Sequence, residues 1–128
     1  MRLAHSALIA LTLAALGATS VLAAPSDPFK GSWRSIDADG SNQILAFGGN
    51  GATRMVTLRD DNATTPACGG GPAVGRGVGE VLGDIIVGTF SLRCASGAVF
   101  DAAFEFTYDQ ATNTLTDAFG GGVVWTRP

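Results

Sequence analysis

The sequence predicts an all-β domain, and three observations lead to this fold class. After residue 23, no apolar i, i+3, i+4, i+7 pattern runs for ten residues without a glycine or a competing alternation, so no helix is expected. Several short runs instead alternate apolar and polar side chains, as half-buried strands do. Clusters of Gly, Asp and Asn separate these runs at regular intervals, which is typical of hairpin turns.

The first four expected strands are short runs separated by glycine-containing turns. In the second strand Leu45 and Phe47 share a face, and in the third Val56 and Leu58 do the same. The fourth strand follows the one long connection, residues 60–72, which contains two prolines and three consecutive glycines. The expected ranges are residues 32–36, 42–47, 53–59 and 74–81.

Among the last four expected strands, the sixth has the clearest alternation in the chain. Its odd positions include Asp101 and Glu105, so one of its faces is polar. The fifth strand repeats this pattern less cleanly, and the last two strands are short and flank three glycines at 120–122. The expected ranges are residues 85–94, 98–108, 114–118 and 123–127.

About eight short antiparallel strands, joined mostly by hairpin-length turns, favour a meander. We expect this meander to form a closed or partly open β-barrel, because closure removes exposed sheet edges. A two-sheet β-sandwich is the alternative. Residues 24–128 are expected to form a single β-barrel-like domain, since about 105 residues are too few for two cores.

Residues 1–23 are predicted to be a secretory signal peptide. A short basic start, Met1-Arg2, precedes an apolar run over residues 7–16, and Ala23 suits a small-residue cleavage site. Cleavage would leave 105 residues with a formal net charge of −4, since Arg2 is the only charged residue lost. The chain would then be secreted or periplasmic and would have no membrane segment. The alternative, an uncleaved anchor helix, needs a longer apolar run.

Cys68 and Cys94 are predicted to form a disulfide, because an exported protein meets an oxidising compartment. The alternative is two buried free thiols. The bridge would close a loop of about 27 residues, which stabilises the fold by roughly 3.5 kcal/mol in the chain-entropy model.

Composition excludes several kinds of chemistry from residues 24–128. The only histidine, His5, lies in the signal segment, so no Ser-His-Asp triad, Cys-His dyad or His-ligated metal site is expected. The net negative charge and scattered arginines disfavour nucleic acid and anionic membranes as partners. Asp37 and Asp39 lie in a D-x-D-G-S-N turn, but its spacing departs from a calcium loop. We therefore expect no metal and no cofactor.

The sequence favours a protein without catalytic residues. Paired carboxylates are the one common catalytic set still available. Asp60 and Asp61 cannot pair with each other, because adjacent strand residues point to opposite faces, and they are interpreted as a solvated strand end. A carboxylate-based hydrolase remains an alternative if Asp101 or Glu105 converges with Asp117.

Two short motifs resemble the calycin group, which includes the lipocalins. They are Gly31-Ser32-Trp33 at the start of the first strand and Trp125-Thr126-Arg127 in the last. The resemblance implies that Trp33 packs across the floor of a barrel beneath Arg127, as a structural closure. The D-x-D-G-S turn, Cys-Gly-Gly-Gly-Pro and Tyr-Asp-x-x-Thr-Asn-Thr-Leu-Thr-Asp are similar to small secreted bacterial β-proteins of an uncharacterised family. That second resemblance bears on the fold alone.

The function that the sequence favours is a secreted, non-catalytic β-barrel that acts as a binding or interaction module. Its partner is expected to be a small apolar molecule in the barrel or a secreted protein on the loops. An alternative is an enzyme inhibitor that presents the disulfide-braced loop of residues 60–72. The aromatic residues expected to line or fill the interior are Phe90, Phe100, Phe104, Phe106 and Tyr108.

Overall fold

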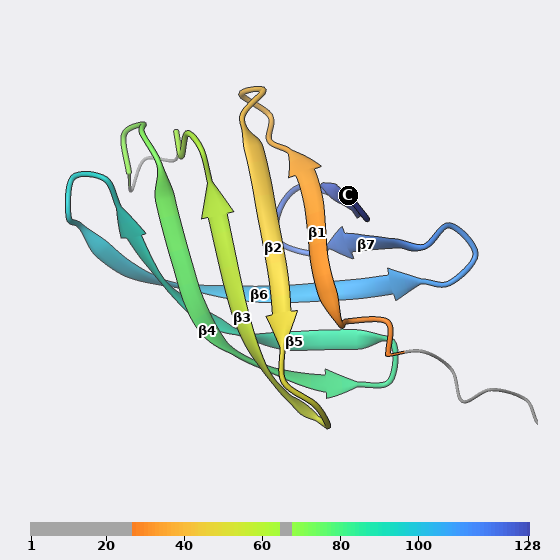
Figure 1. Ribbon diagram of the computed structural model, residues 1–128. Helices are drawn as coiled ribbons and strands as arrows, with labels where there is room; N and C mark the ends of the chain where they lie inside the picture. The colour runs from red at the N-terminus through yellow and green to blue at the C-terminus, as the bar shows by residue number, and fades with distance from the viewer. Residues whose placement is uncertain (1–26, 65–67) are drawn as a thin grey trace, which may run out of the picture.

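The protein is an eight-stranded antiparallel β-barrel in a computed structural model that describes residues 27–64 and 68–128 (Figure 1). The strands pair in chain order and β8 closes on β1, so the predicted meander barrel is confirmed and the two-sheet sandwich is wrong. The predicted signal peptide, residues 1–23, lies outside the described residues. The strands are β1 (Gly31–Ile36), β2 (Asn42–Gly48), β3 (Thr53–Asp60), β4 (Ala73–Leu82), β5 (Ile85–Cys94), β6 (Val99–Asp109), β7 (Thr114–Asp117) and β8 (Val124–Thr126).

Closure of the barrel is uneven around its circumference. Strands β4 and β5 pair over ten residues, whereas β8 and β1 pair only through Arg34 and Thr126. In Figure 1, β1, β2 and β3 cross β5 and β6 at a steep angle. In the described part of the chain, no helix is long and apolar enough to span a membrane.

The two ends of the barrel are built differently. We call the end that carries residues 27–30 and the turns after β2 and β4 the closed end. The opposite end, which carries the turns after β1 and β5, residues 60–64 and residues 117–123, is called the open end. The buried core extends from the closed end through the middle of the barrel, and it consists of Phe29, Trp33, Leu45, Phe47, Val56, Ile86, Phe90, Phe104, Phe106, Leu115 and Trp125.

The middle of strand β4 contributes no side chains to the interior. Its inward positions include Gly75, Gly77 and Gly79, and larger side chains from β5 and β6 occupy the space beside them. A Cβ at Gly77 would lie 1.9 Å from the backbone oxygen of Thr89, so the backbones themselves approach too closely for any other residue. A Cβ at Gly79 would meet only side chains, among them the ring of Phe104 at 3.0 Å. These glycines thus permit the close strand approach expected at a barrel bend.

Candidate functional site

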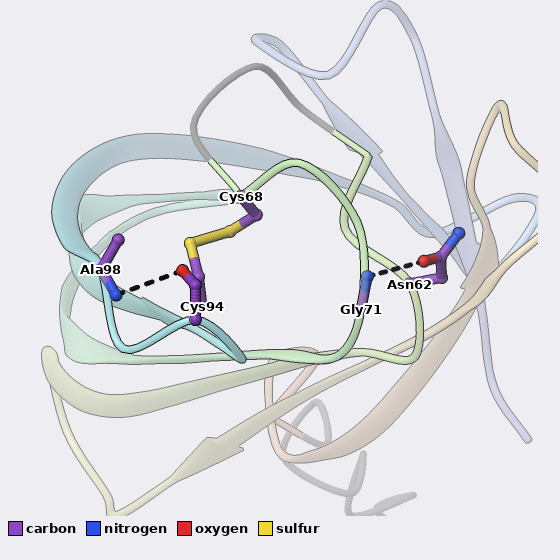
Figure 2. Close-up of a disulfide and its surroundings, with 6 residues drawn as sticks. Asn62, Cys68, Gly71, Cys94 and Ala98 are labelled. Carbon is purple, nitrogen blue, oxygen red and sulfur yellow. Dashed lines mark hydrogen bonds between the residues drawn. A yellow bond between two sulfur atoms is a disulfide. The ribbon is translucent and has the colours of Figure 1, made fainter.

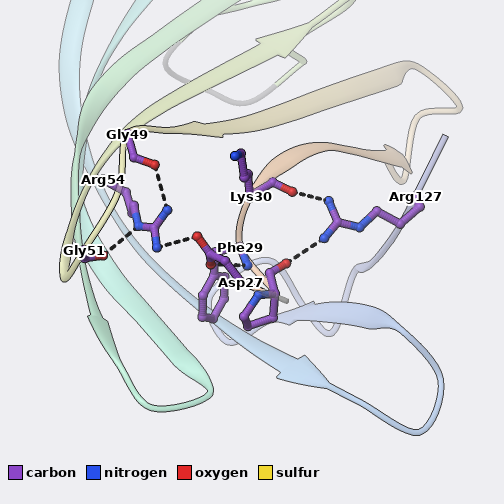
Figure 3. Close-up of polar contacts among 8 residues, drawn as sticks. Asp27, Phe29, Lys30, Gly49, Gly51, Arg54 and Arg127 are labelled. Carbon is purple, nitrogen blue, oxygen red and sulfur yellow. Dashed lines mark hydrogen bonds and ion pairs between the residues drawn. The ribbon is translucent and has the colours of Figure 1, made fainter. Parts of the chain in front are cut away.

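Arg127 closes one end of the barrel over a buried tryptophan. Its guanidinium carbon lies 3.8 Å from the centroid of the Trp33 ring. Its Nη1 donates to the backbone oxygen of Lys30 at 2.6 Å, and its Nη2 donates to that of Pro28 at 2.7 Å (Figure 3). Gly31 has a φ of 99° and leaves room for Arg127, because a Cβ there would lie 3.2 Å from Nη1. Arg127, directly after the last strand, therefore holds the segment that precedes the first strand.

That segment plugs the closed end with an aromatic ring and a carboxylate. The Phe29 side chain is fully buried and packs edge-on against Phe47, with ring centroids 5.8 Å apart. The Asp27 carboxylate forms an ion pair with Arg54, which is only 5% exposed (Figure 3). Arg54 also donates from Nε to the Gly51 oxygen at 2.8 Å, and from Nη1 to that of residue 49 at 2.9 Å. The buried cation thus has a counter-charge and two further acceptors.

The open end of the barrel contains a cavity of about 480 Å³. Its apolar wall comes from strands β3, β5 and β6 and from the connection that follows β7. The residues of this wall include Leu58, Phe90, Leu92, Phe100, Ala102 and Phe119. The interior is therefore packed solid near the closed end and hollow near the open end.

The five aromatic residues predicted to line or fill the interior do not share one cavity. Phe90 and Phe100 line the open-end cavity. Phe104 and Phe106 are 3% and 1% exposed and fill the core beneath it. Tyr108 lies at the closed end, with its ring centroid 6.2 Å from that of Trp33. The reason is length: eight residues of extended strand separate the first ring of β6 from the last, about 26 Å.

A buried carboxylate forms part of the polar wall of this cavity. Asp60 is 7% exposed, so the prediction of a solvated strand end is wrong for this residue, although Asp61 is exposed. Its Oδ1 accepts from the Ser41 hydroxyl at 3.1 Å and from the backbone N–H of Asn62 at 2.9 Å. Its Oδ2 accepts from Gln43 Nε2 at 3.0 Å. All of these donors are neutral, and no described residue forms a salt bridge with Asp60.

Two more carboxylates, Asp37 and Asp117, line the same cavity. In each, Oδ1 accepts a nearby backbone N–H, that of Ala38 at 2.7 Å and that of Phe119 at 2.9 Å respectively. Across residues 27–64 and 68–128 there is no group of three or more His, Cys, Asp or Glu side chains that could hold a metal ion.

The weakly paired seam between β1 and β8 opens a groove of about 790 Å³ beside the cavity. The groove and the cavity share Gln43 and Val123 as lining residues. Ser35 lies on the inward face of β1, directly opposite Gln43, and lines the groove. Its side chain is almost completely buried, and no group of residues 27–64 or 68–128 lies within hydrogen-bond distance of its Oγ.

The rim of the open end is organised by hydrogen bonds to Asp39. Its Oδ2 accepts from Asn62 Nδ2 at 3.2 Å and from the Thr64 hydroxyl at 3.0 Å. Ser41, through its hydroxyl and its backbone N–H, holds the pKa of the Asp39 carboxyl below its usual value, and Thr64 and Asn62 act in the same direction. Asn62 in turn accepts from the Gly71 N–H at 2.8 Å. The D-x-D-G-S-N turn is thereby tied to the long connection.

The predicted disulfide between Cys68 and Cys94 is confirmed, with a Cα–Cα distance of 5.3 Å. Figure 2 shows that the disulfide joins the long connection to the end of β5. The hydrogen bond between Asn62 and Gly71 lies on the opposite side of the connection. The connection is therefore held to β5 by the disulfide and to the turn after β1 by the hydrogen bonds of Asn62 and Thr64 to Asp39. A disulfide is consistent with an extracellular or periplasmic location.

The carboxylate pair considered for catalysis does not form. Asp117 pairs with Phe106, whose side chain lies in the core, so Asp117 faces inward. Glu105 is adjacent to Phe106, and therefore projects from the opposite face of β6. Asp101 is exposed and pairs with Ser91 on the outer face as well. The barrel wall separates both acids from Asp117.

No protein-family model, curated protein sequence or solved structure matches this chain. The architecture itself, a closed barrel of eight antiparallel strands in a meander, is compatible with a lipocalin-like barrel.

Proposed function

We propose that this chain is an exported, non-catalytic β-barrel that binds a small, largely apolar molecule in its open-end cavity. The observation that carries the proposal is the cavity of about 480 Å³ with aromatic and aliphatic walls and a few polar groups. Small-molecule sites in proteins have this size and composition. The contact between Arg127 and Trp33 supports kinship with calycins, and the signal-like residues 1–23 and the disulfide support export.

Binding of a neutral apolar fluorophore tests this proposal. N-phenylnaphthylamine is expected to become fluorescent on mixing with the protein, because its ring system enters an apolar, water-poor site. Ala102→Leu fills the cavity and should weaken binding by about tenfold or more. Ser91→Leu adds a comparable volume on the exposed outer face of β5, and is expected to leave binding unchanged.

The two variants also separate this proposal from the inhibitor alternative. A protein partner that contacted only the loop of residues 60–72 would not respond to filling of the cavity. Equal fluorophore binding by wild type and Ala102→Leu, or no binding by wild type, would therefore remove the cavity as the site of function.

A further inference from the structure

The carboxylate of Asp60 points to the chemical class of the ligand. It is as deeply buried as the guanidinium of Arg54, but only neutral donors satisfy it among the described residues. Removing an ionised carboxylate from water is costly, and three neutral hydrogen bonds recover only part of that cost. The wall that contains Asp60 therefore carries an uncompensated negative charge beside a hollow space.

Two further carboxylates lie around this space, together with Gln43, whose Nε2 already donates to Asp60. Asp37 and Asp117 line the cavity with it, and each has one carboxylate oxygen, Oδ2, to which no described group donates. Ser35 lies on the inward face of β1 in the adjoining groove, and its buried Oγ, which can donate or accept, has no partner among the described residues. In the part of the chain that the structure describes, no lysine or arginine lines the cavity. A ligand group that carries positive charge and donates hydrogen bonds would therefore complement the carboxylates of this wall.

Aromatic side chains complete the site. Phe90, Phe100 and Phe119 line the same cavity as the three carboxylates. Aromatic faces attract organic cations through the ring quadrupole, and they also pack against an apolar ligand body. An ammonium group supplies three N–H donors, which suits acceptors spread over more than one strand.

We propose that the open-end cavity binds an organic ammonium ion, a primary amine with an aromatic or aliphatic body. The ammonium group lies against Asp60 and the neighbouring acceptors, and the apolar body packs on the phenylalanine rings. This inference rests on the proposed function, because it names the ligand class of the same cavity.

A matched set of three ligands tests the charge preference. Phenylethylamine, phenylethanol and phenylpropanoate share a phenyl ring and a two-carbon chain, and differ in a cationic, neutral or anionic end. Titration calorimetry at pH 7 and competition with N-phenylnaphthylamine are expected to show the amine binding about tenfold or more tightly than the alcohol, as hydrogen bonds to charged groups predict. The carboxylate should bind most weakly.

Asp60→Asn keeps the size of the side chain and removes its charge, so it should bring the amine to within about threefold of the alcohol. Asp117→Asn should reduce the preference in the same direction. Asp101→Asn is the matched control, because it removes one negative charge from the exposed outer face of β6. It is expected to change neither affinity. Near-ultraviolet circular dichroism establishes that each variant is folded, and the wild-type ligand series decides the question if Asp60→Asn is not.

Equal affinity of wild type for amine and alcohol would overturn this inference and leave the proposed function standing, provided that the neutral fluorophore binds. An amine preference that survives in both Asp60→Asn and Asp117→Asn would also overturn it. Failure of the fluorophore and of all three ligands would remove the proposed function and, with it, the inference.

Discussion

Arg54 and Asp60 lie on the same inward face of β3, and both are almost completely buried, yet the barrel treats the two charges differently. At the closed end, Arg54 pairs with Asp27 and donates to two backbone carbonyls. At the open end, Asp60 accepts from a hydroxyl, an amide side chain and a backbone N–H, all neutral. The charge of Arg54 is neutralised by a carboxylate of the protein, whereas the charge of Asp60 receives only neutral hydrogen bonds.

The packing around the two residues differs in the same way. Near Arg54, the fully buried ring of Phe29 packs into the barrel interior and Asp27 supplies the counter-charge. Around Asp60, the interior is hollow and acceptors outnumber donors. The same strand therefore buries two charges for different reasons. Arg54 has its counter-charge within the protein and serves to close the barrel, whereas for Asp60 we infer that a bound ligand supplies the counter-charge.

Removal of the disulfide at the open end is expected to have the largest effect on stability. Replacing both cysteines, Cys68→Ala with Cys94→Ala, should lower the free energy of unfolding by about 3.5 kcal/mol, because the unfolded chain loses a constraint on a long loop. Urea titration followed by tryptophan fluorescence measures this. Wild type unfolded under reducing conditions should behave like the double variant, and a loss below about 1 kcal/mol would show that the connection is held by its hydrogen bonds alone.

The next largest effect sharpens the comparison directly. Arg54→Met should cost about 3 kcal/mol, because it breaks a buried ion pair and leaves two backbone carbonyls without a donor. Asp60→Asn should cost less than about 1 kcal/mol, because it removes a buried charge that has no counter-ion among the described residues. Urea titrations of the two variants in parallel measure both, and equal losses would contradict the distinction between the two ends.

A smaller effect is expected at the seam of the closed end. Arg127→Lys keeps the positive charge but cannot place two N–H donors on the oxygens of Pro28 and Lys30, so stability should fall by about 1–2 kcal/mol. Thermal unfolding measures the loss. The exposed outer-face substitution Arg76→Lys is the control and should be neutral. A neutral result for both would show that Arg127 does not hold the N-terminal segment in place.

The smallest effect is a local one at the rim. Because the pKa of Asp39 is lowered in the folded state, its contribution is present above the ordinary value of 3.8 and is lost as the pH falls through the lower folded value. The protection of the Gly71 amide against hydrogen exchange, expressed relative to the rate of an unstructured peptide at the same pH, should therefore fall below pH 3.8, while protection in the β4–β5 ladder changes less. Asp39→Ala should already exchange fast at neutral pH and show no such step.

Much of the fold follows from the sequence because alternation and turn residues are local properties. All eight predicted strands are present, and the predicted disulfide is confirmed. Alternation could also have placed Arg54 and Asp60, because both share the face of Val56 and Leu58. Asp60 is predicted to lie in solvent because it is a hydrophilic residue at a strand end, but closure of the barrel buries it.

Other parts of the site depend on contacts that no local pattern encodes. Phe29 precedes the first strand and belongs to no periodic run, so its burial follows only from the entry of the chain across the barrel end. The division of the interior into a solid and a hollow part depends on where along the barrel each ring lies. Phe100 and Phe104 lie on the same face of β6, but at different heights in the barrel. Phe100 therefore lines the cavity, whereas Phe104 is buried in the core.

The glycines of β4 have a consequence for how such a barrel diverges in evolution. At Gly79 the nearest obstacles to a methyl group are the side chains of Ile86 and Phe104, so smaller residues at both of these positions could compensate for alanine at 79. At Gly77 the obstacle is the backbone of β5, for which no substitution elsewhere compensates. Position 79 is therefore free to change together with positions 86 and 104, whereas position 77 is fixed as long as the two strands stay this close.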